Sequence, residues 1–488
     1  MSRAEARPLP TGLPAWNFES DSTLIQVLAK NAAAFGQKPA MREKDLGIWQ
    51  QITWQELLDT VIAAAAGLDA LGFGPGKAML VLGDNGPRLY MGMLAAGALG
   101  GYPMPVYPDA TPDELRHFAQ ELPLHVAFAD DQEQVDKVLD LRDSGSTIVN
   151  VLFDDPRGVA SYKAPGLQSW DALVAAGHAR LKAEPSLRQA LIDRARPDDP
   201  AVFVHSSGTT GKPKGVVLTH RNLLSGVRNA YQGRAFDFEE DILAYLPMAW
   251  VGDFAMTIGA GIALRFTINV PERSETVLHD LREIAPTWYL ASPRSWDNML
   301  TTIQVRMADS TPLKKWIYEL FMNASLASER RKLEGGEPTA REKLLRPLGE
   351  WLVFGPIKDQ FGLTRLRHAF TGGEAIGEDT FVFYRALGVK LRQLYGQTES
   401  SAYTAMQDVE EVRLHTVGRH LPGVEIRISE AGEILVHSGS VFGGYHEQPD
   451  ATREALEDGW LHTGDAGYLE PDGQLVVLGR LSEVVHTA

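Results

Sequence analysis

The sequence predicts an α/β protein with a largely parallel sheet covered by helices, followed by a small β-rich subdomain. The first basis is that short apolar runs alternate with helical stretches from the N-terminus onward, the pattern of right-handed β-α-β units. The second is that short strands with Gly and Pro turns replace this pattern after Glu411. At 488 residues the chain exceeds the size of one hydrophobic core, so several subdomains are expected.

Hydrophobic periodicity gives the elements in order. A helix is expected over 23–35, and a strand over 49–53 precedes a second helix that a capping box opens at Thr53 and that extends to Leu71. Another helix is expected over 89–99 and one more after Glu275. A mainly helical region runs from Pro293 to about Leu348, and its charged clusters predict solvated helix faces. The remaining strands are expected at 78–82, 104–107, 125–128, 148–152, 201–204, 288–291, 424–428, 432–436 and 474–478.

Composition excludes several classes of protein. The chain carries 47 Lys and Arg against 63 Asp and Glu, a net charge of −16, which argues against nucleic acid or an anionic membrane as the main partner. It has no cysteine, which excludes disulfides, thiolate metal sites and cysteine nucleophiles. No apolar run approaches the roughly 18 residues of a membrane span, and the first residues lack the apolar core of a signal peptide. We therefore expect a cytoplasmic protein.

One stretch of the sequence has the residue types of an anion-binding loop. Directly after the apolar run 201–204, glycines, hydroxyls and lysines follow one another. The glycines let the backbone turn tightly and bring its N–H groups to an anion, and the lysines add positive charge. The spacing is not that of a Walker A loop, and Pro213 stands where that motif continues into a helix. The stretch reads Ser206, Ser207, Gly208, Thr209, Thr210, Gly211, Lys212, Pro213, Lys214, Gly215.

This stretch resembles the phosphate loop of the adenylate-forming (AMP-binding) enzymes, which include acyl-CoA synthetases, peptide-synthetase adenylation domains and luciferases. The resemblance implies an α/β domain of two parallel-sheet subdomains covered by helices, over residues 1–478, with the β-rich subdomain at about 411–478. The long helical region resembles the branch of long-chain fatty acyl-CoA synthetases. Further family motifs follow in order at 246–254, 370–375, 394–399, 460–465 and 479–483.

The resemblance implies a site for ATP and Mg²⁺. Lys214, Thr210 and Glu399 are the catalytic candidates, and Glu399 together with Ser206 would hold Mg²⁺ through hard oxygen ligands. Tyr395 would offer its ring to adenine. Thr398 would contact the α-phosphate, and Asp465 would accept from the ribose hydroxyls. The expected nucleotide contacts are Ser206, Ser207, Gly208, Thr209, Thr210, Gly211, Lys214, Gly373, Glu374, Ala375, Tyr395, Gly396, Gln397, Thr398, Asp465 and Arg480.

The acyl site is implied by the segment 246–254. Trp250 occupies the position of a family histidine that borders the acyl group, and Phe254 follows it as a candidate channel residue. Both side chains could equally be ordinary core packing. The apolar residues of this segment suit fatty and aryl acids alike, so the sequence does not fix the substrate.

The implied reaction is attack of a carboxylate on ATP to give an acyl-adenylate, followed by transfer to coenzyme A. A long-chain fatty acid is the leading substrate. The alternatives are an acyl-AMP ligase that loads a carrier protein, an aryl-CoA ligase, and a nucleotide- and lipid-binding module without catalysis. Oligomeric state and peripheral contact with a membrane stay open.

The end of the chain departs from the family pattern. Residues 479–488 resemble the start of the family's hinge, but Ser482 stands where the family usually has Lys or Asp. The family's smaller C-terminal lid domain, which carries a catalytic lysine, has no counterpart here. Because the chain stops within an apolar stretch, we expect that the natural protein continues past Ala488; the alternative is a natural protein that lacks or borrows the lid. In both cases we expect this chain alone to show little complete turnover.

Overall fold

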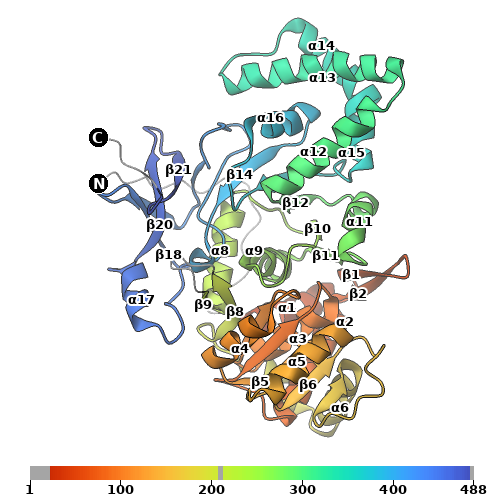
Figure 1. Cartoon of the computed structure of the whole chain (residues 1–488), viewed down its shortest axis with the longest axis vertical. Coiled ribbons are helices and arrows are strands. Elements are labelled where there is room, and N and C mark those ends of the chain that lie inside the picture. The colour runs from red at the N-terminus through yellow and green to blue at the C-terminus, as the bar shows by residue number, and fades with distance from the viewer. Residues whose placement is uncertain (1–21, 207–212, 484–488) are drawn as a thin grey trace.

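The computed structural model describes residues 22–206 and 213–483 (Figure 1). In this view an α/β layer built from the first part of the chain lies at the bottom, and a second sheet with its helices lies above it. A group of helices forms the top, and the C-terminal strands lie at the left side. The α/β class with parallel sheets and a C-terminal β-rich part is confirmed. The domain boundaries stay a prediction.

The N-terminal sheet has the strand order β4-β3-β5-β6-β7, and every neighbouring pair is parallel. Alternate residues of β3 point to opposite faces, as strand geometry requires. Met79 and Val81 join the core beneath α2 and α3, whereas Leu80 and Leu82 pack with α4 and α5. The strands are β3 (Ala78–Leu82), β4 (Tyr102–Val106), β5 (Leu124–Ala129), β6 (Asn150–Phe153) and β7 (Leu167–Ser169). The helices are α2 (Trp54–Ala70), α3 (Pro87–Ala98), α4 (Pro112–Glu121), α5 (Gln132–Asp143), α6 (Trp170–Ala183) and α7 (Ser186–Ile192).

A smaller sheet joins this layer to the next part of the chain. Its order is β10-β11-β1-β2, with β1 parallel to β11 and antiparallel to β2. Its strands are β1 (Pro39–Asp45), β2 (Ile48–Thr53), β10 (Asp241–Leu243) and β11 (Thr267–Val270). The helical elements beside it are α1 (Leu24–Phe35), α8 (His220–Gln232), α9 (Val251–Asp253), the π-helix η1 (Phe254–Ala260), α10 (Gly261–Leu264), η2 (Ser274–Thr276) and α11 (Val277–Ile284).

The predicted phosphate loop connects two antiparallel strands. β8 (Pro200–Ser206) and β9 (Lys214–Thr219) form a hairpin in which Ser206 pairs with Lys214. The strand before the loop was expected, but β9 was not. The loop residues Ser207, Gly208, Thr209, Thr210 and Gly211 lie outside the described residues.

A second α/β layer follows, with the order β12-β13-β14-β15-β16. Its first three strands are parallel and the last two are antiparallel. The strands are β12 (Trp288–Ala291), β13 (His368–Thr371), β14 (Leu391–Tyr395), β15 (Ala405–Met406) and β16 (Arg419–His420), and η4 (Thr398–Ser400) follows β14. The helix α16 (Glu378–Leu387) connects β13 to β14 along the chain.

The helical region is longer than the sequence indicated. It begins at Pro293 as expected but continues to Gln360 instead of ending near Leu348, because a π-helical turn carries it beyond α14. It comprises α12 (Pro293–Ala308), α13 (Pro312–Leu333), α14 (Ala340–Gly349), η3 (Glu350–Phe354) and α15 (Gly355–Gln360), and α13 with α14 forms the top of the molecule in Figure 1.

The C-terminal sheet is antiparallel, with β21 beside β20 in the order β17-β18-β20-β19. Its ten-residue strand β20 contains the expected ribose-contacting segment. The elements are β17 (Val424–Ile428), β18 (Glu433–Ser438), α17 (Pro449–Ala455), β19 (Leu456–Glu457), β20 (Trp460–Leu469) and β21 (Leu475–Arg480).

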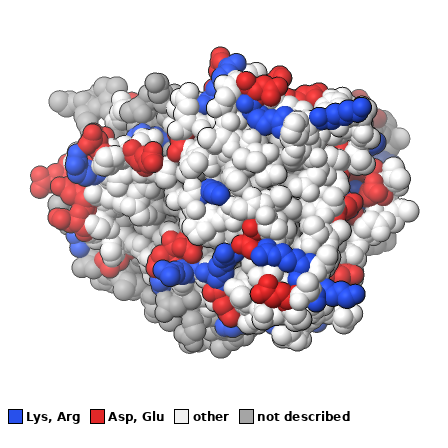
Figure 2. Space-filling model, turned by 90° about the horizontal axis from the view of Figure 1, so that it is seen from below, with Lys and Arg blue, Asp and Glu red and all other residues white. Residues whose placement is uncertain are grey.

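The charge on the surface and the hydrophobicity of the helices bear on how the molecule contacts large partners. Seen from below, acidic and basic side chains mix around a largely uncharged centre (Figure 2), so this face has no single-sign field. Among the described residues, no helix combines the length and the apolar character that crossing a membrane requires.

Close helix packing in the N-terminal layer gives a first test. A Cβ added at Gly177 of α6 would lie 1.8 Å from the carbonyl oxygen of Ala63 in α2, so the two backbones leave no room for a methyl group. Helix propensity alone would make Gly177→Ala stabilising. Steric overlap outweighs propensity here, so we expect a loss of about 1–3 kcal/mol in the free energy of unfolding.

Denaturant unfolding measures this change. Gly74→Ala is the matched control, because a Cβ there meets no atom within 4 Å. Equal stability of the two variants would contradict the close approach of α2 and α6.

Candidate active site

The parallel strands β13 and β14 end side by side, and their carboxyl ends carry two of the predicted motifs. Thr371 at the end of β13 pairs with Gln393 of β14. Gly372 packs so closely on Leu394 that a Cβ there would lie 2.9 Å from its side chain. Gly373 has a φ of +89° and open space around it, and Glu374 and Ala375 are exposed. A flat, accessible backbone segment therefore lies beside Tyr395, at the strand edge where open α/β sheets bind ligands.

The carboxylate of Asp465 joins the C-terminal sheet to the end of β14. Its Oδ2 accepts a hydrogen bond from the Tyr395 hydroxyl at 2.7 Å and from Gln397 Nε2 at 2.6 Å. Its Oδ1 lies 3.2 Å from Nη1 of Arg480, which faces Asp465 across the β20–β21 pair. Gln397 Nε2 also donates to the Thr463 carbonyl at 2.9 Å. Burial and the nearby Asp465 hold the pKa of Tyr395 well above its usual range, so the phenol stays a donor.

A second network joins the phosphate-loop hairpin to the predicted metal ligand. Glu399 is buried, and its Oε1 accepts a hydrogen bond from the Tyr445 hydroxyl at 2.8 Å. Lys214 Nζ lies 4.9 Å from the centre of the same tyrosine ring, a cation–π contact. Tyr445 is held in place because the following His446 N–H donates to the Gly215 carbonyl at 2.9 Å. The structure thus brings Lys214 and Glu399 into contact with one side chain, Lys214 at its ring and Glu399 at its hydroxyl.

Two buried hydroxyls at strand ends have no hydrogen-bond partner among the described residues. They are Ser206 Oγ at the end of β8 and Thr371 Oγ1 at the end of β13. A buried hydroxyl without a partner is unfavourable, and most native hydroxyls have one. The second oxygen of Glu399 likewise receives no hydrogen bond from the described chain. Free hydroxyls, a carboxylate oxygen and a lysine are the groups that a nucleotide with Mg²⁺ requires, so these residues fit such a ligand.

The predicted acyl residues lie at the start of the helical segment that contains η1. The Trp250 ring covers Gly252, where a Cβ would lie 2.4 Å from it. Phe254 is 1% exposed and begins the π-helix η1. Phe254 is therefore part of the core, and only Trp250 of the pair is partly exposed. Single π-helical turns inside helices are frequent at functional sites.

Sequence reasoning missed Asp253, which lies between these two residues. Its carboxylate is buried and accepts hydrogen bonds from the Tyr90 hydroxyl at 2.7 Å and the Thr257 hydroxyl at 3.0 Å. Tyr90 in turn accepts from Asn85 Nδ2 at 2.9 Å, and Asn85 also donates to the Ala244 and Leu246 carbonyls. The network ties the segment 244–254 to the N-terminal layer. Burial raises the pKa of Asp253 to about 7 although both hydroxyls act in the opposite direction.

Tyr445 was also missed. The signal was an aromatic residue after two glycines, Gly443 and Gly444, in a turn beyond β18. Such a turn has many structural explanations, and only the fold brings it to β9 through a bridge between Val216 and Tyr445.

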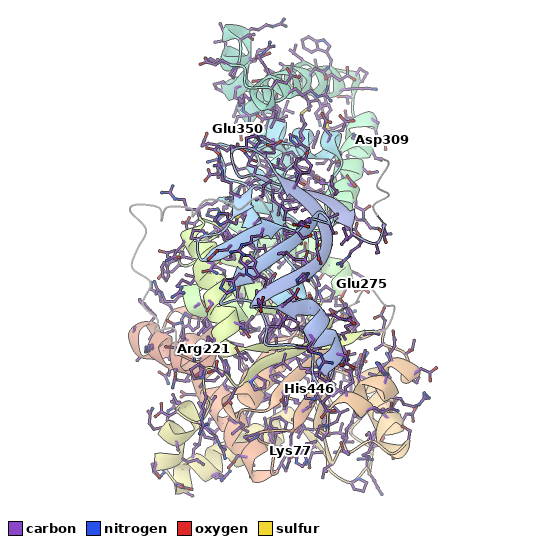
Figure 3. The ribbon with its side chains drawn as sticks, turned by 90° about the vertical axis from the view of Figure 1, so that its left-hand side faces the viewer. Lys77, Arg221, Glu275, Asp309, Glu350 and His446 are labelled. Carbon is purple, nitrogen blue, oxygen red and sulfur yellow. The ribbon has the colours of Figure 1, made fainter. Side chains whose placement is uncertain are left out.

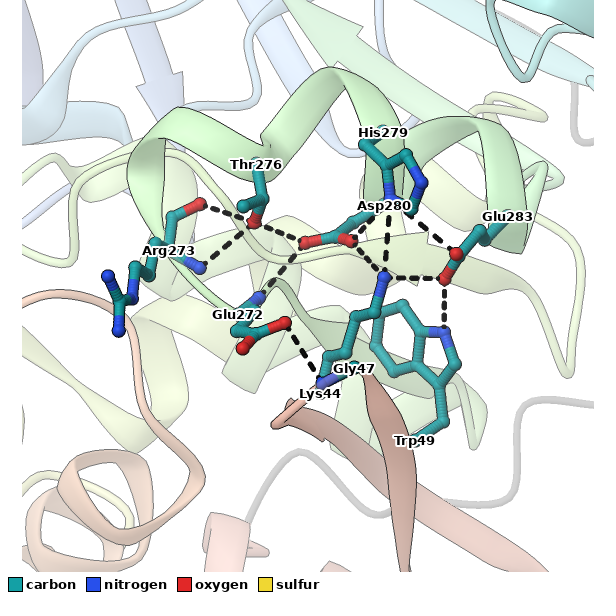
Figure 4. Close-up of polar contacts among 9 residues, drawn as sticks. All are labelled: Lys44, Gly47, Trp49, Glu272, Arg273, Thr276, His279, Asp280 and Glu283. Carbon is teal, nitrogen blue, oxygen red and sulfur yellow. Dashed lines mark hydrogen bonds and ion pairs between the residues drawn. The ribbon is translucent and has the colours of Figure 1, made fainter.

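Two clusters contain residue types that bind metals, but basic side chains form ion pairs with the acidic residues of both. Lys44 Nζ lies 2.8 Å from both Asp280 and Glu283 beside His279, so an ammonium group already fills this cluster (Figure 4). Burial disfavours the charged form of Lys44, but these two hydrogen bonds outweigh that effect and raise its pKa. The second cluster, Asp237, Glu240 and His368, contains Arg367 Nη2 at 2.7 Å from Glu240. Both clusters are ion pairs that connect elements.

The comparison with known families agrees with this geometry. The sequence model of the family described as AMP-binding enzyme matches residues 28–446, most of the chain. The protein belongs to the AMP-binding enzyme family.

Its relatives include fatty-acid ligases. It is 25% identical over 480 residues to the long-chain-fatty-acid–CoA ligase ACSBG2 of Xenopus laevis, covering 96% of this chain and 64% of that protein. It is 29% identical over 444 residues to the long-chain-fatty-acid–CoA ligase FadD15 of Mycobacterium bovis, covering 91% of this chain and 71% of the relative. The chain thus spans about two thirds of the length of these relatives.

Solved structures share the fold at low identity. The N-terminal domain of FACL13 from Mycobacterium tuberculosis superposes with a TM-score of 0.66 at 19% identity, over 94% of this chain and all of that one. The anthranilate CoA ligase AuaEII, solved with anthranoyl-AMP, gives a TM-score of 0.73 at 14% identity, over 97% of this chain and 80% of its own. At these identities the likeness establishes the fold alone.

The buried Asp253 gives a test with a defined pH dependence. An aspartate in the unfolded chain has a pKa near 3.9, so a folded value of about 7 means that the folded state holds the proton more tightly. Its contribution to stability is complete below about pH 4 and is lost as pH rises to about 7. Asp253→Asn removes this loss. We expect the variant to gain roughly 2–4 kcal/mol relative to wild type between pH 4 and pH 8.

Denaturant unfolding at several pH values measures the difference between the two proteins. The exposed Asp109 provides the control Asp109→Asn, which should follow the wild-type profile. The free energies of unfolding of wild type and Asp253→Asn could instead differ by the same amount at every pH. That result would show that the Asp253 carboxylate is ionised throughout.

Proposed function

We propose that the protein uses ATP to activate a carboxylic acid, a long-chain fatty acid, and then transfers the acyl group to coenzyme A. The observation that supports this most is the arrangement of Lys214, Tyr445 and Glu399 beside the Asp465 network. Together these residues offer a cation, a carboxylate and several oriented donors beside the end of β14. The relatives at 25–29% identity are long-chain-fatty-acid–CoA ligases, which supports the choice of substrate.

In the proposed first step, a carboxylate oxygen attacks the α-phosphorus of ATP. The bond from that phosphorus to the oxygen bridging to the β-phosphorus breaks, and pyrophosphate leaves. Little covalent help is needed from the protein, so positioning and charge neutralisation dominate. Lys214 would neutralise the β- and γ-phosphates with the hydroxyls of Ser206, Thr209 and Thr210.

The other proposed nucleotide contacts lie near the ends of β13 and β14 and on the C-terminal sheet. The backbone of Gly373–Ala375 and the ring of Tyr395 would lie against adenine, and Thr398 would contact the α-phosphate. Asp465 Oδ2 already accepts two hydrogen bonds, so its Oδ1 is the oxygen left for the ribose hydroxyls, with Arg480 beside it. Glu399, with Ser206, would hold Mg²⁺, which supplies charge neutralisation to the phosphates when bound.

The proposed second step is attack of the coenzyme A thiol on the acyl carbon. The carbon–sulfur bond forms as the bond to the AMP oxygen breaks. Trp250 would border the carboxylate end of the acyl group, since its ring lies over Gly252 at the entrance to η1. That coenzyme A is the thiol that accepts the acyl group is also part of this proposal.

Exchange of labelled pyrophosphate into ATP tests the first step on this chain. With acetate, benzoate, anthranilate, octanoate and palmitate as acids, we expect exchange that is fastest with palmitate, because the relatives at 25–29% identity are long-chain-fatty-acid–CoA ligases. Exchange only with benzoate or anthranilate would make the protein an aryl-acid ligase. ATP binding without exchange for any acid would favour a binding module without catalysis.

A variant of Tyr445 tests the proposal that Glu399 holds Mg²⁺. Tyr445→Phe keeps the ring beneath Lys214 but removes the hydroxyl that orients Glu399. Because partners that orient a metal ligand typically contribute 10–100-fold to metal affinity, we expect the Mg²⁺ concentration for half-maximal exchange to rise by about tenfold.

The control is Tyr468→Phe, because Tyr468 of β20 is exposed. Binding of AMP without metal should be the same in both variants and wild type. An unchanged Mg²⁺ requirement in Tyr445→Phe would remove Glu399 from the metal site.

A further inference from the structure

Exposed apolar side chains are concentrated on the helices at the top of the molecule. Fourteen large hydrophobic residues of the described chain are exposed, and half of them lie within residues 305–352. Both exposed tryptophans are among them, Trp316 at 60% and Trp351 at 74%. The seven are Val305, Leu313, Trp316, Leu344, Leu348, Trp351 and Leu352. A concentration of exposed apolar side chains on a solvent-facing surface indicates an interaction site, whereas scattered ones are ordinary.

Six of these residues lie on α13 and on α14 with η3, and Val305 lies on α12. On α13, Leu313, Trp316 and Leu320 follow helical spacing opposite the buried Phe321 and Met322. On α14 and η3, the exposed Leu344, Leu348 and Trp351 continue from Arg341 in the same way, opposite the buried Gly349. A groove of about 570 Å³ lies between α13 and α14. It is lined by Trp316, Glu319 and Leu320 of α13 and by Arg341 and Glu342 of α14, among others, so the apolar face of α13 borders it.

Positive charge accompanies the apolar stripes. Residues 293–360 contain 11 Lys and Arg against 9 Asp and Glu, although the whole chain has 47 against 63. Lys314, Lys315 and Arg341 are exposed and form no ion pair with the described residues. In Figure 3, Asp309 and Glu350, which flank α13 and α14, lie toward the end of the molecule opposite Lys77.

We propose that the α13–α14 tip docks on the surface of a bilayer that contains anionic lipids. Tryptophan and leucine on one helix face with lysine and arginine beside them is the composition of segments that lie in the membrane interface. The lysines favour anionic headgroups over a second copy of this chain, because self-association would bring the same cations together. Docking needs only this surface, so it does not depend on the proposed reaction.

Vesicle co-sedimentation of the whole chain tests docking. We expect binding to vesicles of phosphatidylcholine with phosphatidylglycerol, weaker binding to phosphatidylcholine alone, and weaker binding at high salt. The double variant Leu344→Ser/Trp351→Ser should lower the partition constant on both lipids by at least about tenfold. Lys314→Glu/Lys315→Glu should lower it about tenfold or more on the anionic vesicles only.

Matched controls separate the tip from general effects. Leu278→Ser removes an exposed leucine from another helix, α11, and Lys30→Glu/Lys182→Glu reverses two exposed helical lysines elsewhere. Both should bind like wild type, and thermal unfolding should show every variant folded. Equal binding by the tip variants and their controls would overturn the proposal. A dimer of wild type without lipid that becomes monomeric in Leu344→Ser/Trp351→Ser would also overturn it, since the tip would then be an interface between copies.

Discussion

The buried carboxylate of Asp465 is the constraint on which the candidate site depends. Taking a carboxylate out of water is unfavourable unless donors replace the lost hydration. The donors here come from two different sheets, because Tyr395 and Gln397 follow β14 whereas Arg480 lies on β21. Moving the C-terminal sheet away from β14 would therefore remove the Tyr395 and Gln397 donors and leave the carboxylate with Arg480 alone. This penalty helps to hold the C-terminal sheet against the end of β14.

The same principle extends to the phosphate-loop hairpin. Glu399 follows Gln397 by two residues, so fixing β14 also fixes the predicted metal ligand. Tyr445 then connects Glu399 to Lys214 at the start of β9. The hydroxyls of Ser206 and Thr371, which have no hydrogen-bond partner within the described part of the chain, lie at strand ends next to segments that carry predicted nucleotide contacts. The folded chain therefore has stabilisation to gain from a ligand that supplies acceptors to these hydroxyls.

The sequence predicted elements well where local information is sufficient. The strands at 78–82 and 288–291 were found with their bounds, because a short apolar run between turns has one simple interpretation. The helix opened by Thr53 was found because a capping box acts over three residues. β9 and β20 were missed, since their residues mix glycine and polar groups and become strands only by pairing with β8 and β18. The site motifs were found one by one, but their connections through Tyr445 and Asp253 join residues far apart in the chain.

The charge of the whole chain illustrates the same limit. A net charge of −16 argues against an anionic membrane as the main partner, and that argument treats charge as evenly spread. The fold spreads it unevenly: residues 293–360 hold 11 basic against 9 acidic residues, which leaves 36 against 54 for the remainder. At physiological ionic strength, exposed charges act over about 8 Å, far less than the length of a helix such as α13. A lipid headgroup at the tip would therefore meet the local lysines and not the acidic remainder of the molecule.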